Sequence, residues 1–433
     1  MNFETKTTQA SAQAGGTGAS PPVPRTPLIS SRLPEVGMTI FSVMSALAAK
    51  HGAVNLGQGF PDFDCAPGLV EAVHAAMQAG HNQYPPMAGV PALRQALAAK
   101  IERLYGHRYN ADSEITITAG ATQGILTAIL ALVHPGDEVI VLEPCYDSYG
   151  PAITLAGGTV VRVPLGAPRA GLSPARPPGG FEKLGNGPSF PESPAGFHLD
   201  LAQLSAALSP RTRAIIINTP HNPTGSVWSA ADMKALAELL RPTDVLVLSD
   251  EVYEHMVFDG QAHASVSAEP ELAARSLVIS SFGKTYHVTG WKVGHVAAPA
   301  ALMAEFRKVH QFNVFTVNTP MQHGLAAWLA DPGPYEELPA FYQRKRDRFR
   351  NGLAGTRFEL LPCTGSYFQC VDYSRISSLA DLQFCEWLTA EIGVAAIPLS
   401  AFYASAPERP IVRFCFAKTE ATLDEALRRL SRL

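Results

Sequence analysis

The chain has 433 residues, of which 46% are hydrophobic and 17% charged, and its formal net charge at pH 7 is -4. This length exceeds what one hydrophobic core usually organises, so it predicts a globular protein of two domains. The slightly negative charge gives no electrostatic reason to expect nucleic acid or an anionic membrane as a partner, and no apolar run approaches the ~20 residues that span a bilayer.

The N-terminal residues 1–27 lack a contiguous apolar core, carry Glu4 early and soon become rich in Gly, Ser and Pro. This composition predicts a disordered tail and not a secretory signal. The six cysteines are scattered without a Cys-x-x-Cys pair, which favours reduced thiols over disulfides or a zinc site. Together these features predict a cytoplasmic protein.

From about Val54 to Leu302, short β-branched runs alternate with alanine-rich helical stretches. The apolar runs are continuous, which is typical of strands covered on both faces by helices in a mainly parallel sheet. They are Ile115–Thr118, Val139–Leu142, Ala214–Ile217, Val245–Leu248 and Leu277–Ser280. Ligands of such sheets bind beyond the carboxyl ends of the strands.

The Pro/Gly-rich stretch Gly166–Gly196 is predicted to be a loop or insertion, and both a functional and a linking role are open. After about Pro320 the pattern predicts a smaller α+β domain, completed by the segment that follows the N-terminal tail. Its expected elements are a helix at Phe341–Leu353, a strand at Ser366–Val371, a helix at Leu382–Ile392, a strand at Ile411–Phe416 and a last helix opening at a Thr422/Glu425 capping box.

Lys284 directly follows an apolar strand, in the run Ser280-Ser281-Phe282-Gly283-Lys284. An isolated lysine is usually a solvated surface charge, whereas burial at a strand end disfavours the ammonium form. Forming an imine removes that charge, and the released amine can then move a proton. Lys284 is therefore the candidate Schiff-base lysine of a pyridoxal-phosphate enzyme.

That cofactor also needs a carboxylate for its pyridine nitrogen and donors for its ring oxygen. Asp250 ends the preceding predicted strand, Val245–Leu248, although a helix-capping role would also explain it. Tyr253 and Asn222 are suitable donors, and Asn222 lies in the turn Asn222-Pro223-Thr224-Gly225.

The remaining demands are an anion cradle, a flat partner for the ring and a cation for the substrate. The loop Gly120–Gly124 precedes a predicted helix and can offer its amides to a phosphate, with Ser281 and Lys292 beside it. Tyr146 is a candidate for stacking on the ring, or an ordinary core aromatic. Arg413 lies in an apolar strand, where a substrate carboxylate or a buried structural ion pair would explain it.

With these residues in place, the chain resembles the class I aminotransferases of pyridoxal-phosphate fold type I. Within them it is most similar to bacterial methionine aminotransferases and kynurenine/glutamine transaminases. The resemblance covers about Pro34 to Leu433, and its motifs include Val54–Phe63, Ser249–Tyr253, the Lys284 segment and Arg413–Phe416. It implies an α/β fold with a large domain built on a mainly parallel seven-stranded sheet, at residues 61–315. Residues 28–60 and 316–433 would form the small domain.

The resemblance also implies a role for each matching position. Lys284 would bond the cofactor aldehyde, Asp250 would hold the pyridine nitrogen, and Asn222 with Tyr253 would bind the ring oxygen under a stacked Tyr146. The phosphate would be bound by Ala121, Thr122, Gln123, Ser281 and Lys292, with Tyr84 reaching the phosphate of a neighbouring subunit. The substrate would meet Arg413, Gly59, Asn222, Phe41 and, across the interface of a homodimer, Phe315.

The expected reaction is ping-pong transfer of an amino group from an L-amino acid to a 2-oxo acid. Phe41, Phe60, Tyr84 and Phe315 favour an apolar or aromatic donor such as methionine, and the lack of an identified second arginine disfavours aspartate. Two alternatives stay open: a carbon–sulfur β-lyase that acts on cysteine conjugates, and a non-catalytic pyridoxal-phosphate-binding module. Lys292 stands where most of the broad class has arginine, which is consistent with the closer group.

Overall fold

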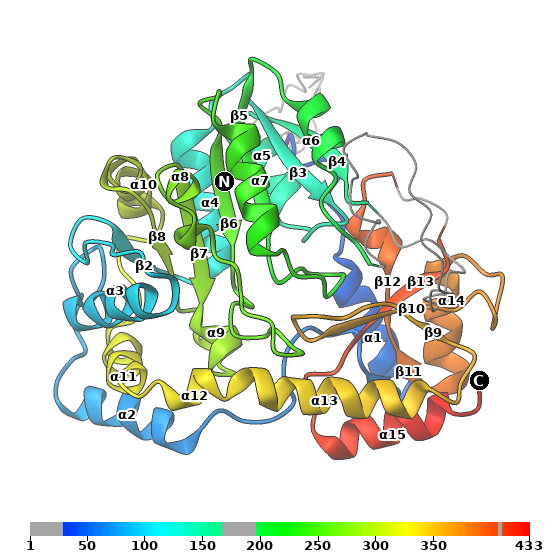
Figure 1. The fold of residues 1–433 in the computed structure, drawn as a ribbon. Coiled ribbons are helices and arrows are strands. Elements are labelled where there is room, and N and C mark those ends of the chain that lie inside the picture. The colour runs from blue at the N-terminus through cyan, green and yellow to red at the C-terminus, as the bar shows by residue number, and fades with distance from the viewer. Residues whose placement is uncertain (1–28, 167–195, 406–408) are drawn as a thin grey trace, which may run out of the picture.

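A computed structural model describes residues 29–166, 196–405 and 409–433 of the chain. The strands of these residues form a seven-stranded sheet, a four-stranded sheet and a two-stranded pair. In Figure 1 the large sheet and its helices lie above the long helix α13 (Leu338–Leu353), and the small sheet lies to their lower right. The predicted tail at 1–27 lies outside the described residues, as does the predicted loop at 166–196 except for its two end glycines.

The large sheet is mainly parallel, as the sequence predicted. Its strands are β2 (Ile115–Thr118), β3 (Glu138–Glu143), β4 (Thr159–Pro164), β5 (Thr212–Asn218), β6 (Leu246–Asp250), β7 (Ser276–Ser281) and β8 (Gly294–Ala297). They follow the order β2-β8-β7-β6-β5-β3-β4, and β8 alone among them runs antiparallel to its neighbours. The carboxyl ends of β5, β6 and β7 therefore meet at one edge.

Helices cover both faces of this sheet, which is why its strands are apolar along their whole length. Val139 and Val141 pack into the core cluster of one face, and Ile140 and Leu142 into that of the other. The helices on the first face are α4 (Ala121–Leu132), α5 (Tyr149–Ala156) and α10 (Ala300–Asn313); on the second, α6 (Leu201–Ala207) and α7 (Ala230–Leu240). Around the β2 edge lie α2 (Pro67–Gln78), α3 (Pro91–Tyr105) and α11 (Thr319–Leu329). Short helices are α8 (Pro270–Ala273), α9 (Phe282–Thr285) and α12 (Gly333–Glu336).

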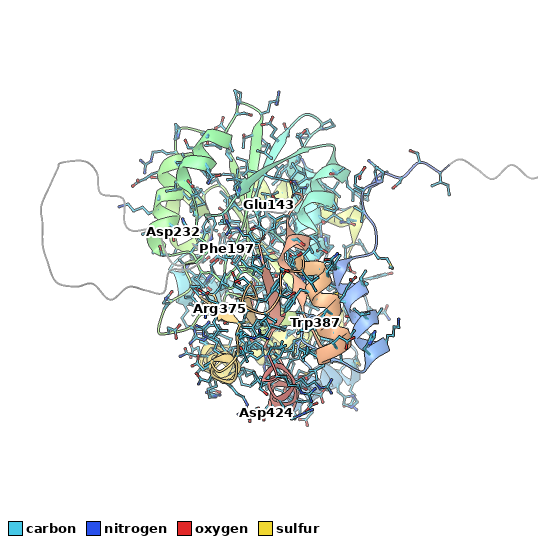
Figure 2. All side chains as sticks on the ribbon, turned by 90° about the vertical axis from the view of Figure 1, so that its right-hand side faces the viewer. Glu143, Phe197, Asp232, Arg375, Trp387 and Asp424 are labelled. Carbon is cyan, nitrogen blue, oxygen red and sulfur yellow. The ribbon has the colours of Figure 1, made fainter. Side chains whose placement is uncertain are left out.

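The small sheet is antiparallel and lies against α13, α14 (Asp381–Trp387) and α15 (Glu420–Leu430). Its strands, in order, are β12 (Ile397–Pro398), β13 (Ile411–Cys415), β10 (Phe368–Asp372) and β9 (Glu359–Leu360). Figure 2 shows the two parts one above the other, with Glu143 at the end of β3 toward the top and Asp424 of α15 at the bottom.

The segment after the N-terminal tail pairs with a C-terminal strand in the separate two-stranded sheet, and not with the large sheet. Helix α1 (Ile40–His51) leads to β1 (Val54–Asn55), which pairs in parallel with β11 (Val394–Ala395). Figure 1 shows α1, in blue, beside these C-terminal elements. This pairing fits a small domain made of both chain ends, while the boundaries at residues 60 and 315 stay a prediction.

Three local predictions need correction or adjustment. The last helix does not open at Thr422: its N-cap is Thr419, whose hydroxyl accepts from the Thr422 amide, and the Thr422 hydroxyl donates to Asp62 instead. The strand expected from Ser366 begins at Phe368, because Ser366 has a left-handed backbone (φ 59°). The helix expected to run to Ile392 is α-helical only to Trp387, and a π-helical turn continues it.

The described residues can be compared with two predictions, that the cysteines form no disulfides and that no segment spans a membrane. All six cysteines are free thiols, five of them buried. No helix within the described ranges combines the length and the apolar character needed to cross a bilayer.

Candidate active site

A cavity of about 240 Å³ opens at the carboxyl ends of β5, β6 and β7. Residues of β10, β13 and the segment after α1 line it as well, so both sheets contribute side chains. Among the predicted site residues, only Gln123, Tyr84 and Phe315 do not line this cavity. The structure thus brings together residues that are up to several hundred positions apart in the chain.

The polar turn that carries Asn222 is fixed to the end of β6 by one side chain. Asn218 stands opposite Asp250 in the paired strands β5 and β6. Its Nδ2 donates to the Asp250 carbonyl at 2.8 Å, and its Oδ1 accepts from the Asn222 backbone N–H at 2.8 Å. Asn218 therefore holds the Asn222 side chain over the strand end, where a ring ligand would meet it.

Asp250 is buried and held by two donors. The Tyr149 hydroxyl donates to its Oδ2 at 2.6 Å, and the Val252 backbone N–H donates to its Oδ1 at 3.3 Å. Burial raises the pKa of Asp250 to about 6, against the lowering effects of these donors and of Lys284. A carboxylate kept out of water in this way is available to a cationic nitrogen of a ligand.

Lys284 lies in α9, directly after β7, and its amine points at the segment after α1. Its Nζ donates to the Gly59 carbonyl at 3.2 Å and to the Tyr367 hydroxyl at 2.9 Å. Burial lowers the pKa of Lys284 to about 8, because the surrounding protein replaces water around the ammonium group. At pH 7 about a tenth of this amine is therefore uncharged and nucleophilic, far more than for an ordinary lysine.

The N-terminus of α4 forms an open anion cradle. Its N-cap is Gly120, which has a positive φ of 82° and provides no side chain to cap the first amides. A Cβ at Gly120 would lie 3.5 Å from Nζ of Lys292, so the lysine amine stands close beside these free N–H groups. Ser281 lines the same end of the cavity. Free amides at a helix N-terminus with a neighbouring ammonium are a suitable phosphate site.

Arg413 of β13 is fully buried and incompletely paired. Its Nη1 donates to Asn222 Oδ1 at 2.7 Å and its Nη2 to the Gly57 carbonyl at 3.0 Å, but its Nε has no partner among the described residues. The guanidinium stacks on Phe368, at 3.9 Å from the ring centroid. Burial lowers the pKa of Arg413, which remains charged because the ordinary value for arginine is so high. A buried guanidinium without a counter-ion is suited to a ligand carboxylate.

Three predicted residues lie away from the cavity walls. The side chain of Gln123 turns back into its own helix, with Oε1 accepting from the Ala119 N–H and Nε2 donating to Thr127, so only its backbone amide is left for an anion. Tyr84 and Phe315 lie together on the surface, with ring centroids 5.3 Å apart, and are 80% and 48% exposed.

Three residues of the site were missed by sequence reasoning. Tyr149 is the first residue of α5, and its ring packs edge-on against that of Tyr146, which lies in the loop before the helix. Tyr367 and Phe368 belong to the start of a small-sheet strand, and nothing in their sequence context marks them as neighbours of Lys284. Their placement depends on how the two sheets pack.

The charges of the cavity define what ligand it fits. Lys284, Lys292 and Arg413 are cationic and Asp250 is the single carboxylate among its described lining residues. Such a set fits a phosphorylated cofactor with a cationic ring nitrogen, plus one substrate carboxylate. The uncapped α4 amides and the buried Asp250 carboxylate each match one demand of pyridoxal phosphate, so the residues present fit that group. The unpaired Arg413 Nε is left for the substrate carboxylate.

Comparisons with known proteins agree with this geometry. The family model described as aminotransferase class I and II matches residues 51–430. The chain is 51% identical to the methionine aminotransferase of Escherichia coli (strain K12) over 409 residues, which are 94% of this chain and 99% of that protein. It is 35% identical to kynurenine–oxoglutarate transaminase 1 of Homo sapiens over 410 residues, 88% of this chain and 93% of that protein.

A solved structure gives the same picture in three dimensions. The match is a crystal structure of a protein from Escherichia coli, with a TM-score of 0.86 and 51% sequence identity. That structure and the reactivity of the protein are described as identifying a methionine aminotransferase function. The match covers 94% of this chain and 100% of that one.

Proposed function

Since this chain belongs to the class I and II aminotransferases, a pyridoxal-phosphate-dependent family, we propose that it transfers the α-amino group of methionine or another apolar or aromatic L-amino acid to a 2-oxo acid. The observation that carries the proposal is the cavity in which Lys284, Asp250 and Arg413 meet at the carboxyl ends of parallel strands. Membership in this enzyme family also argues against the non-catalytic binding module, which was an open alternative from the sequence.

The residues that would hold the cofactor follow from the charges and donors of the cavity. Asp250 would face the pyridine nitrogen, with Tyr253 and Asn222 at the ring oxygen and Tyr146 against the ring. The phosphate would lie at the α4 N-terminus, bound by the amides of Ala121, Thr122 and Gln123 together with Ser281 and Lys292. When bound, pyridoxal phosphate supplies the electron sink for the pair left at the substrate Cα.

The protein's own part in the chemistry is to orient the substrate and to move one proton. Arg413 binds the α-carboxylate through its unpaired edge, and the fixed Asn222–Arg413 contact at 2.7 Å sets the orientation of both groups. The Lys284 amine, with a pKa of about 8, would take the proton from the substrate Cα as a base and deliver it to the bound cofactor as an acid.

The substrate part of the proposal rests on the aromatic side chains around Arg413. Phe41 and Phe60 line the cavity beside Phe368, and all of the described lining residues together include only one arginine. An apolar donor side chain can pack against these rings, whereas a second carboxylate would lack a cation.

A donor panel tests this function. We expect single-turnover conversion between the two cofactor forms to proceed with methionine, phenylalanine, leucine or kynurenine at least about 100-fold more efficiently than with aspartate, since an unpaired buried carboxylate costs several kcal/mol. Absence of conversion with every donor, in protein that has taken up the cofactor, would contradict the proposal. Release of pyruvate and ammonia from a cysteine conjugate without an acceptor would instead point to the β-lyase.

Replacing Arg413 by lysine tests its role at the substrate carboxylate. The substitution keeps the charge but removes the planar fork, so we expect kcat/KM for the amino donor to fall about 10–100-fold, mainly through KM. Binding of the cofactor, followed by its visible absorbance, should not change. Arg350→Lys is a matched control, because Arg350 bonds the neutral acceptors Leu361 O and Gln369 Oε1 outside the cavity. Equal KM values in the two variants would exclude the assigned role.

We further propose that the active unit is a homodimer, with Tyr84 and Phe315 crossing to the partner's site. Both are exposed aromatics in contact with each other, and Phe312, three positions before Phe315 in the chain, is 86% exposed. The Thr319 hydroxyl donates to the Gln83 carbonyl at 2.6 Å and so ties the two segments together. Exposed apolar patches of this kind mark interaction surfaces. Sedimentation at micromolar concentration should give twice the mass of the chain; a monomer that is active would contradict the proposal.

The domain boundaries predicted from the sequence are also proposed. Residues 61–315 would form the large domain, and 28–60 with 316–433 the small one, as the β1–β11 pairing supports.

The predicted cytoplasmic location is proposed as well. The free, mostly buried cysteines support a reducing compartment and hence this location.

A further inference from the structure

Tyr367 is the one hydroxyl in contact with the amine of Lys284 among the described residues. It is fully buried, immediately before β10, and comes from the opposite sheet to Lys284. Its oxygen accepts from Lys284 Nζ at 2.9 Å, and its own proton goes to the Gly59 carbonyl at 2.5 Å. The Gly59 carbonyl also accepts from Lys284 Nζ, at 3.2 Å. Three groups from three parts of the chain thus form a closed triangle of hydrogen bonds.

We propose that Tyr367 is a further active-site residue of the transamination: with the Gly59 carbonyl it holds the free amine of Lys284 so that the nitrogen lone pair stays open toward the substrate Cα. This inference rests on the proposed function, because it assigns the proton transfer to Lys284. It goes beyond it by naming the groups that orient the amine while it is not bonded to the cofactor.

Counting hydrogens shows why this arrangement favours a base. A tyrosine hydroxyl has a single hydrogen, and here that hydrogen is committed to the Gly59 carbonyl. The Tyr367 oxygen can therefore only accept from Lys284, and it cannot donate to the lone pair. A neutral amine has two hydrogens, one for each acceptor. In the proton transfer the Cα–H bond breaks and an N–H bond forms, while the electron pair of the C–H bond stays with the substrate carbon and the bound cofactor.

The ionisation of the two groups is consistent with these roles. Burial raises the pKa of Tyr367 well above its ordinary value, with neighbouring Tyr253 acting in the same direction, so the hydroxyl keeps its proton at all working pH values. Burial lowers the pKa of Lys284 to about 8, so the amine passes between its two forms near neutral pH. Tyr367 remains a fixed acceptor while Lys284 changes its charge.

The alternative to this role is that Tyr367 acts only through the packing of its ring. Its ring lies among aromatics, with centroids 4.8 Å from Phe368, 5.1 Å from Tyr253 and 5.8 Å from Tyr342. Tyr342 supplies a matched control: it is also fully buried and touches the same cluster, but its hydroxyl has no partner among the described residues. Tyr342→Phe removes the same atom from the same cluster without touching Lys284.

The first experiment measures the amine directly in cofactor-free protein. Reductive methylation with formaldehyde and cyanoborohydride, read at Lys284 by peptide mass spectrometry across pH 6 to 10, reports the midpoint of its deprotonation. Loss of an acceptor disfavours the ammonium form, so Tyr367→Phe should shift the midpoint down by about one pH unit. Tyr342→Phe should leave it unchanged. A common midpoint for the wild type and both variants overturns the proposal.

The second experiment measures the consequence in the cofactor-loaded enzyme. With methionine as donor, Tyr367→Phe should slow the single-turnover reaction about 10-fold or more, because the amine is less well oriented, and Cα-deuterated methionine should give a larger kinetic isotope effect than in the wild type. An unchanged rate and isotope effect overturns the proposal. If the wild type itself transfers no amino group from any donor, the proposed function fails, while the labelling midpoint still reports the Tyr367 contact independently.

Discussion

Lys284→Ala is expected to reduce turnover by at least about 10⁴-fold, the upper range for loss of a positioned acid–base group, because the same amine is also proposed to bond the cofactor. The visible absorbance of the lysine-bound cofactor should disappear, while the cofactor itself can still be held by Asp250 and the amides at the start of α4. The structure explains why no other group takes over: the other cations that line the described cavity are Lys292, at the phosphate cradle, and Arg413, which bonds Asn222.

The measurement is a single-turnover assay with methionine, together with an absorbance spectrum of the reconstituted protein. Small primary amines added to Lys284→Ala should restore part of the rate, since the cavity left by the side chain gives them access to the Cα proton. Lys308→Ala is the matched control, because Lys308 is an exposed lysine paired with Glu305. Full activity of Lys284→Ala would refute its assignment as the catalytic base.

The sequence predicted well those features that depend on local order. The continuous apolar strands and the polar residues that follow them, Asp250 and Lys284 among them, specify a parallel sheet and the edge at which ligands bind. Parallel pairing then brings Asn218 opposite Asp250 with no further information. These residues are near each other because neighbouring strands of one sheet end together.

What the sequence did not predict depends on packing between parts of the chain. Tyr367 reaches Lys284 only because the small sheet closes over the large one. Gln123 was predicted from its place in a phosphate loop, but its amide side chain finds nearer partners in Ala119 and Thr127. Helix α15 has its N-cap at Thr419 instead of Thr422 because Asp62, from the other end of the chain, accepts hydrogen bonds from the Thr419 amide and the Thr422 hydroxyl.

Asp250→Asn is expected to reduce the rate of the first half-reaction roughly 10²–10⁴-fold. Removing one partner of a buried charge pair costs about 3–5 kcal/mol, and each 1.4 kcal/mol is a factor of ten in rate. Without the carboxylate, the pyridine nitrogen of the bound cofactor would lose its proton, and the ring would be a poorer electron sink. Stopped-flow absorbance with methionine measures the effect. Tyr149→Phe gives a graded comparison, because it removes only the 2.6 Å hydrogen bond and should cost about tenfold or less.

Asp250→Asn should not unfold the protein. Its effect on the reaction rate can therefore be separated from an effect on stability. In cofactor-free protein the pKa of Asp250 is raised from 3.8 to about 6, so the folded state binds this proton more tightly than the unfolded state does. The free energy of unfolding contributed by this group therefore falls as the pH rises from about 4 to 6, and above pH 6 the folded protein carries the full cost of a buried charge. Asparagine avoids that cost, so cofactor-free Asp250→Asn should be at least as stable as the wild type at pH 7–8 in thermal unfolding. A variant that is both inactive and less stable would show that Asp250 supports the fold, and the assignment to the pyridine nitrogen would lose its main support.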